Sequence, residues 1–170
     1  MLATSFLPLA LLILAVLGLQ KMGVKQEHGA EAVLMAAAKA DGKTIGEIEN
    51  FRWQIELFDS MPEELQLALL ESSLEDMAEI DEMMGKLVAS WSTGDIEAMA
   101  ALLNESMRDD PGLAKLLLTD RNARWAEWID ERLDKPGTVF MAVGAGHRGG
   151  PDSVQAMLEK KGIESQRVEG

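Results

Sequence analysis

A glycine-rich run near the end of the chain holds the residues best suited to chemistry. Residues 144–150 read Gly-Ala-Gly-His-Arg-Gly-Gly and follow the apolar, β-prone run 138–143. We expect 138–143 to be a buried strand, and ligands in open α/β sheets bind at the carboxyl ends of strands. His147 is then predicted to be a metal ligand or a general base, with Gly144 and Gly146 letting the backbone approach a ligand. The alternative is a tight turn that His147 caps by hydrogen bonding.

The same run matches the letters of a dinucleotide-binding fingerprint, Gly-x-Gly-x-x-Gly. Such a site also needs an acidic residue about twenty positions further on, to bind the ribose. That position falls near Arg167, close to the last residue of the sequence. A nucleotide site is therefore the weaker interpretation.

A second candidate lies in the preceding helical segment. Leu117, Arg121 and Trp125 follow one another at intervals of four, which places Arg121 on an apolar stripe. An inward-facing charge needs a partner or a ligand, and arginine is suited to binding a carboxylate or an oxyanion with two hydrogen bonds. The alternative is an internal ion pair with Asp120, Glu49 or another acid.

Glu49 is a third candidate, in Ile-Glu-Asn at the end of a predicted short strand, with Gln54 about one turn further on. Its carboxylate could orient His147 or Arg121. An ordinary acidic residue at a helix N-terminus explains it equally well. The other histidine, His28, lies in a polar turn and is expected to be structural or solvated.

Composition excludes several classes of function. The chain has 170 residues and a net charge of −13, which fits one domain or a large piece of one. The acidic excess argues against nucleic acid or an anionic membrane as the main partner. The absence of cysteine excludes disulfides, cysteine-bound zinc, iron–sulfur clusters and thiol nucleophiles. Two histidines cannot supply a site with three histidine ligands from one chain.

The elements that would position these residues are mostly helical. The closing strand–helix–strand pattern predicts a helix-rich α/β fold whose few-stranded sheet includes a parallel pair. Ser60 and Glu63 form the capping box of a long helix that runs to Trp91, and Pro151 occupies the first position of the last helix. We expect strands at 43–49, 138–143 and 163–168, and further helices at 31–40, after 93–95 and from the 109–112 turn to about 133.

The N-terminal residues 1–19 carry no charge. Their length would allow a membrane span or an export signal, yet no Lys or Arg precedes the run and no small-x-small cleavage site ends it. We therefore expect residues 6–19 to be a buried helix rather than a membrane anchor. Membrane association through 1–19 remains the alternative.

Several of these residues together resemble the C-terminal signature of the TraB/GumN family, which is related to the Tiki proteases and more distantly to the erythromycin esterase and ChaN groups. The resemblance rests on the Arg-Asn-x-x-Trp-Ala and Gly-x-x-His motifs and on positions in the same order upstream. In this sequence they are Arg121, Asn122, Trp125, Ala126, 139–147, 150–152 and 154–158, with Gly23, 29–31, Ala38, Gly42, Lys43, Ile48, Glu49, Gln54, Trp91, Gly94 and Asp95 before them.

The resemblance implies a metal-dependent peptidase supported by manganese or cobalt, as in the Tiki branch, with zinc also considered. The family carries two Gly-x-x-His motifs, and only the second is present, ending at His147. The four residues ending at His28 begin with Lys25 and so are no first copy. The chain therefore resembles the C-terminal half of the family fold, a partial domain over residues 1–170.

The sequence departs from the family pattern at two positions, and only the first departure changes the charge. Arg148 stands where an apolar residue follows the histidine, and Glu31 replaces an aspartate. Arg148 would place a positive charge beside the site. The predicted catalytic residues are His147, Arg121 and Glu49. The predicted substrate-binding residues are Gly144, Gly146, Asn122 and Arg148, and His147 is the predicted metal ligand.

Three hypotheses follow for function. The first is a Tiki-type hydrolase of a peptide or small molecule, completed by a missing N-terminal half or a second copy. The second is a non-catalytic peptide-binding or regulatory protein of the cell envelope. The third is an inactive fragment that self-associates through exposed apolar surface. The family leans toward the cell envelope or periplasm, and the cytoplasm is the alternative.

Overall fold

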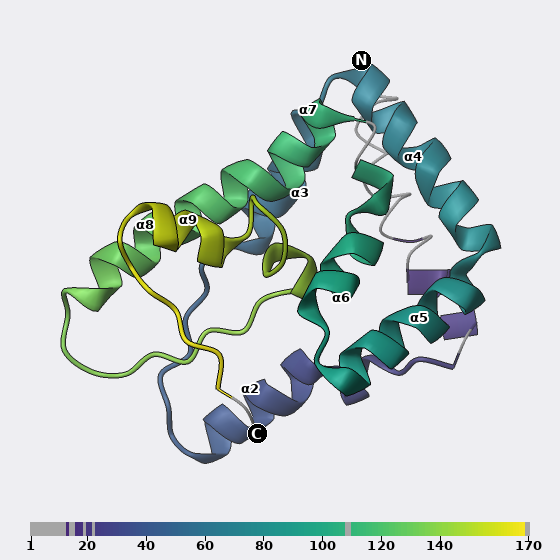
Figure 1. Cartoon of the computed structure of the whole chain (residues 1–170). Helices are drawn as coiled ribbons and strands as arrows, with labels where there is room; N and C mark the ends of the chain where they lie inside the picture. The colour runs from purple at the N-terminus through teal and green to yellow at the C-terminus, as the bar shows by residue number, and fades with distance from the viewer. Residues whose placement is uncertain (1–12, 14–15, 19, 22, 108–109, 169–170) are drawn as a thin grey trace. The chain divides into compact units, whose positions relative to one another are not determined.

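A computed structural model describes residues 13, 16–18, 20–21, 23–107 and 110–168 (Figure 1). The chain divides into two compact units, Met1–Asp81 and Glu82–Gly170.

The described part of the first unit is built from helices and their connections. The 3₁₀-helix η2 spans Gln26–His28 and packs against α2, Ala30–Ala40. The next helix, α3, spans Phe51–Asp59, and the side chain of Asn50 caps it by accepting from Trp53 N (2.8 Å). Helix α4 follows at Glu63–Ala78. Its neighbour α5, Ile80–Thr93, begins at the boundary of the two units.

The second unit contains the remaining helices. Helix α6 spans Ile96–Leu103 and is capped by Asp95, which accepts from Ala98 N (3.0 Å). The 3₁₀-helix η3, Glu105–Met107, leads to a helical stretch whose successive parts are α7, η4 and α8. They span Pro111–Ala114, Lys115–Thr119 and Asp120–Leu133, and η4 is a π-helical turn. After η5, Ala145–His147, the last helix is α9, Val154–Lys160.

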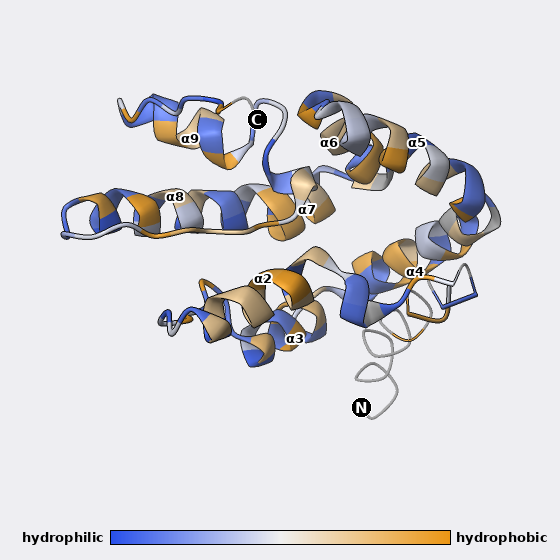
Figure 2. Ribbon diagram, turned by 90° about the horizontal axis from the view of Figure 1, so that it is seen from below, coloured by the Kyte–Doolittle hydropathy of each residue, from blue (hydrophilic) through white to orange (hydrophobic). Residues whose placement is uncertain are grey.

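The expected α/β fold is wrong, because no strand occurs among the described residues. The run 138–143 is extended but pairs with no other segment of the described part, and Phe140 is 78% exposed. Figure 2 shows this stretch after α8 as largely hydrophobic. The predicted strands 43–49 and 163–168 are also irregular. Apolar β-prone residues form a strand only where a second strand supplies hydrogen-bond partners for their backbone. The sequence pattern does not show that such a second strand is missing here.

Three helix boundaries also differ from expectation. Ser60 does not cap α4; it ends α3, and its hydroxyl donates to Leu57 O (2.9 Å). The long apolar stripe is divided between two helices, because α4 ends at Ala78 and α5 begins at Ile80. The last helix starts three residues after Pro151, at Val154. The side chain of Ser153 supplies its cap by accepting from Ala156 N (3.2 Å). The helices predicted at 31–40, after 93–95 and up to 133 are present.

Most of the N-terminal apolar run lies outside the described residues. Of its described positions, Ile13, Val16 and Leu17 are helical and about half exposed. No helix of the described part is both long enough and apolar enough to span a membrane.

The buried core of the described chain is concentrated in the second unit. Trp125 and Ala126 on α8 are buried, as are Val154 and Leu158 on α9, and these two helices pack against each other. Ala100, Leu113 and Asn122 are buried in the same unit, whereas Met61 is the buried apolar residue of the first. The best-packed part of the molecule is therefore the part that carries the glycine-rich loop.

Candidate functional site

Close packing against α6 sets the course of the glycine-rich loop. Residues 145–147 form the short turn η5, which lies against α6, and Asn104 at the end of α6 donates from Nδ2 to Gly146 O (2.9 Å). A Cβ at position 146 would lie 3.0 Å from Asn104 Oδ1 and 3.4 Å from Leu103 Cβ. Glycine at 146 therefore allows this close approach without a shift of Asn104, and the contact fixes where the next residue, His147, begins.

The imidazole of His147 meets the side chain of Asn122, which is 0% exposed. Nδ1 of His147 lies 2.7 Å from Asn122 Oδ1, and Asn122 Nδ2 donates to Asp152 O (2.6 Å). A carbonyl can only accept, so Asp152 fixes which end of the amide is the donor. Asn122 Oδ1 therefore accepts from Nδ1–H of His147. In the neutral imidazole this leaves Nε2 as the nitrogen with the lone pair.

Trp125 of α8 packs on the imidazole, and Arg121 of the same helix packs on Trp125. The ring of Trp125 is 4.4 Å from that of His147, centroid to centroid, at an angle of 42°. Arg121 Cζ lies 5.3 Å from the centroid of Trp125, within the range of a cation–π contact. Arg121 Nη1 also donates to Leu117 O (3.1 Å). Because Asn122 and Trp125 are three apart on one helix, both reach the same loop.

The chain after His147 is also held against α6. Gly150 N donates to Glu97 Oε2 (3.0 Å), and Gly150 has a φ of +80°, a conformation that favours glycine. A Cβ at position 149 would lie 2.6 Å from Ala100 Cβ and 3.1 Å from Ile96 O. Position 149 therefore has no room for a side chain, whereas a side chain at 146 would require Asn104 to move by a few tenths of an ångström.

A pocket of about 300 Å³ lies beside this loop, within the second unit. Its walls are mainly small and apolar, and the residues with carboxylates in its lining are Glu97 and Asp152. The remaining lining residues come from α6, η3, the helix that begins at Pro111 and the loop after His147: Ala100, Ala101, Asn104, Met107, Ala114, Leu118, Gly149, Gly150 and Pro151. The pocket is suited to a small apolar group, with negative charge nearby.

The structure brings some of the predicted site residues together. His147, Asn122 and Arg121 form one cluster through Trp125, with Gly146 behind it, and Gly144 O accepts from His147 N (3.1 Å). Arg148 is exposed, and its Nε donates to the side chain of Gln155 (3.1 Å). Glu49 belongs to the first unit, where it accepts from Gln54 Nε2 (3.4 Å). The catalytic roles expected of these residues remain predictions.

Sequence reasoning missed three residues that hold the cluster. Asn104 is separated from Gly146 by 42 positions, and no pattern in the sequence connects them. Asp152 contributes only its backbone carbonyl, which its residue type does not reveal. Trp125 was placed on the apolar stripe, and only its spacing of three from Asn122 could have indicated a contact with the same loop.

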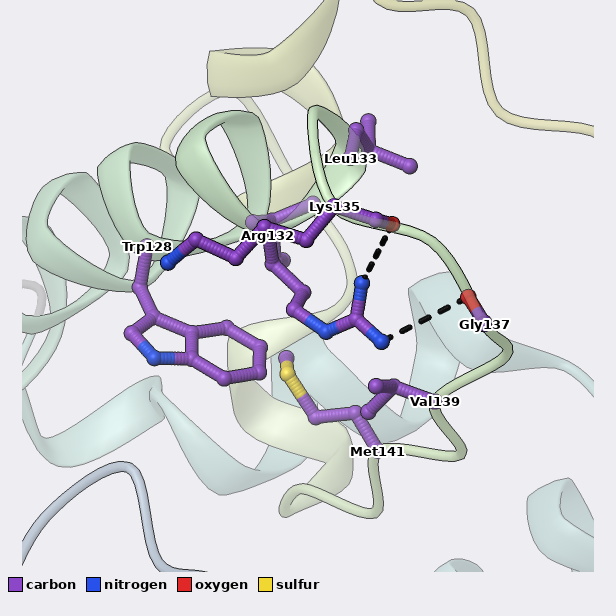
Figure 3. Close-up of a pocket in the computed structure, with 8 residues that line it drawn as sticks. Trp128, Arg132, Leu133, Lys135, Gly137, Val139 and Met141 are labelled. Carbon is purple, nitrogen blue, oxygen red and sulfur yellow. Dashed lines mark hydrogen bonds between the residues drawn. The ribbon is translucent and has the colours of Figure 1, made fainter.

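A second pocket, of about 240 Å³, lies at the far end of α8 (Figure 3). Arg132 braces it by donating to Lys135 O (2.7 Å), Pro136 O (3.2 Å) and Gly137 O (3.4 Å). The apolar lining residues are Trp128, Ile129, Leu133, Val139 and Met141. Because His147 is not part of its lining, we treat this pocket as separate from the histidine cluster.

Near the cluster, α8 is tied to the end of α9 by charge. Lys161 Nζ lies 2.9 Å from both Glu127 Oε2 and Asp130 Oδ2. Hydrogen bonds to Asp130 and Glu127 raise the pKa of Lys161, since they favour its charged form. This contact joins the two helices that position Asn122 and Asp152.

The described residues do not supply a complete metal site. No group of three or more His, Asp or Glu side chains among them is arranged to hold an ion. Catalytic zinc sites generally use three protein ligands. His147 could supply one ligand through Nε2, and the hydrogen bond from its other ring nitrogen is the support that metal-binding histidines usually have.

Comparison with known proteins identifies relatives over most of the chain. The family model described as TraB/PrgY/gumN family matches residues 3–167. The uncharacterized protein YbaP of Escherichia coli (strain K12) is 27% identical over 139 residues, and YbaP of Shigella flexneri gives the same values. The match covers 82% of this chain and 51% of each relative, so the chain spans about half the length of these relatives. No solved structure matches.

Proposed function

Since the chain belongs to the TraB/PrgY/gumN family, we propose that it contributes part of a metal-dependent hydrolase site of the peptidase type. His147 is the working group, as a metal ligand or as a general base. The proposed substrate is a peptide or a small molecule with a bond of similar chemistry.

The observation that carries the proposal is the chain of hydrogen bonds from His147 through Asn122 to Asp152 O. A histidine acts as a base or a ligand through a nitrogen lone pair, and its other nitrogen must then hold the proton. Buried Asn122 selects that tautomer and fixes the plane of the ring. An ordinary loop cap would require neither the choice of tautomer nor a buried amide dedicated to it.

In this proposal His147 would supply one ligand, through Nε2, to a divalent ion such as Mn²⁺, Co²⁺ or Zn²⁺, and the other ligands would have to come from elsewhere. When bound, such an ion lowers the pKa of a coordinated water and polarises a carbonyl. This chain's own residues orient the imidazole and restrict its motion, because Asn122 holds Nδ1 and Trp125 packs on the ring. The same support serves a general base, which must keep its lone pair aimed at the proton that it removes.

The other predicted residues fit around this centre. The guanidinium of Arg121 is one residue from Asn122 and could stabilise developing negative charge. In this proposal Gly144 and Arg148 line the substrate side, whereas buried Asn122 and Gly146 support the imidazole. The catalytic role expected of Glu49, which belongs to the first unit, stays a prediction. The pocket beside Gly149 and Gly150 would take a small apolar group of the substrate.

In this proposal the remaining ligands come from a second polypeptide segment. One histidine does not satisfy the three ligands of a catalytic ion, and the relatives are about twice as long as the stretch that matches. Exposed Trp91 (71%) and Phe140 (78%) leave large apolar surface for such a partner to cover. The segment would come from a part of the family domain not represented here or from a second copy of the chain.

A non-catalytic peptide-binding role in regulation is the second candidate. The specific observation in its favour is that the described residues hold no group of three metal-ligating side chains. In this case the cluster would recognise a ligand through hydrogen bonds and would not activate water.

Thermal melts with added Mn²⁺, Co²⁺ or Zn²⁺ test the hydrolase proposal on the chain as it exists. An ion that binds only the native state raises the melting midpoint by mass action. We expect an upward shift that is lost in His147→Ala and retained in His28→Ala, and any peptide cleavage with Mn²⁺ should follow the same pattern. Absence of a shift, or equal shifts in wild type and His147→Ala, would refute metal binding at His147.

A further inference from the structure

The helix that carries the site changes its hydrogen-bond pattern just before the site begins. The helical run from Pro111 to Leu133 is interrupted by the π-helical turn η4, Lys115–Thr119. Within this turn the backbone N–H of Asp120 donates to Lys115 O, five residues back instead of four. Single π-turns inside α-helices occur frequently at functional sites.

The turn decides which side chain faces His147. An α-helix rotates by about 100° per residue, so one extra residue rotates everything after it by about that angle. Asn122 and Trp125 lie directly after the turn, and both contact the imidazole. With an uninterrupted α-helix from Pro111, the side facing His147 would carry a neighbour of Asn122. The hydrogen bonds to His147 and Asp152 would then be lost.

Two side-chain contacts span the π-turn. Lys115 and Asp120 form an ion pair on its exposed side. Residues five apart point about 140° away from each other in an α-helix, so the π-turn brings this pair together. On the other side, Arg121 Nη1 donates to Leu117 O (3.1 Å), a carbonyl within the turn. The exposed pair contributes little to stability, whereas the guanidinium bonds a backbone atom and lies over Trp125.

We propose that the π-turn of residues 115–119 is the device that positions Asn122 and Trp125 against His147, and that Arg121 is the positioning residue that holds it. Arg121 ties the turn to the ring of Trp125, and Trp125 packs on the imidazole. This inference deepens the proposed function and rests on it for the importance of His147. Its test, however, reads the state of the imidazole and needs neither metal nor turnover.

Nitrogen-15 NMR of the imidazoles is the test, because the chain has only His147 and His28. In wild type, at a pH where both rings are neutral, we expect His147 to populate the Nδ1–H tautomer alone. We expect the exposed ring of His28 to populate a mixture of the two tautomers. In Arg121→Lys we expect His147 to lose the single-tautomer signature. A lysine ammonium cannot both bond Leu117 O and lie flat over Trp125. Arg52→Lys, on exposed α3, is the matched control and should change neither ring.

A second variant and a wild-type measurement keep the test decisive if Arg121→Lys does not fold. Deleting Thr119 removes the extra residue of the turn while retaining Arg121, and it should also abolish the Nδ1–H signature of His147. Hydrogen-bond scalar couplings in wild type should connect Asp120 N–H to the carbonyl of Lys115. A coupling to Leu116 instead, or an unchanged His147 tautomer in folded Arg121→Lys, would overturn the inference. If the tautomer changes occur as expected but no metal binds at His147, the proposed function is refuted and this inference is not.

Discussion

Replacing Asn122 by alanine should destabilise the chain more than the same change at another asparagine. The substitution removes the acceptor of His147 Nδ1–H and the donor to Asp152 O, and Asn122 is 0% exposed. Because His147 is half-buried and Asp152 is exposed, each lost hydrogen bond costs about 1 kcal/mol, roughly 2 kcal/mol together. At an unfolding entropy of about 2.1 cal/mol/K per residue, the 170-residue chain would melt about 6 °C lower in a single transition.

Two other asparagines provide matched controls for this prediction. Asn50 caps α3 from an exposed position, and its replacement by alanine should cost about 1 kcal/mol. Asn104 makes one half-buried hydrogen bond, to Gly146 O, and its replacement by alanine should also cost about 1 kcal/mol. Urea unfolding followed by circular dichroism gives the three free energies of unfolding. A cost for Asn122→Ala no greater than that for Asn50→Ala would refute the account of the buried amide.

Three further predictions concern contacts within the second unit. Gly149→Ala should cost about 1–3 kcal/mol in urea unfolding, because the new Cβ would lie 2.6 Å from Ala100 Cβ. Gly85 lies in α5 with open space around it, so Gly85→Ala should instead stabilise the chain by about 1 kcal/mol. Equal changes in the free energy of unfolding for the two glycine variants would contradict the packing argument. Lys161→Gln should lower the melting temperature at pH 7. Its pKa is raised in the folded state, so this difference should fade as the pH rises above 10.5, and a difference that grows there would be inconsistent. Arg132→Gln should destabilise by about 1–2 kcal/mol, because the guanidinium donates to the carbonyls of 135–137, and an unchanged urea midpoint would argue against that brace.

The sequence predicted the components of the cluster better than the fold around them. His147 and Asn122 could be found because glycine spacing and the Arg-Asn-x-x-Trp motif are local patterns. The prediction of a strand at 138–143 was wrong, because apolar residues indicate burial but do not show whether a second strand is there to pair with them. The π-turn was not predicted, because Lys-Leu-Leu-Leu-Thr fits an ordinary α-helix and the extra residue appears only in the hydrogen-bond pattern. The contact of Asn104 with Gly146 is likewise a property of the tertiary structure.

Broadening of the two imidazole signals by Mn²⁺ is the most direct test of the central claim, that His147 is the oriented, metal-competent group. His28 is exposed whereas His147 is half-buried, so unspecific binding would favour His28. Paramagnetic broadening detects even the weak binding expected of a site with one ligand. The account predicts that His147 broadens at lower Mn²⁺ concentrations than His28, and that Asn122→Ala removes this preference. Broadening of His28 first, or of both rings together, would contradict it.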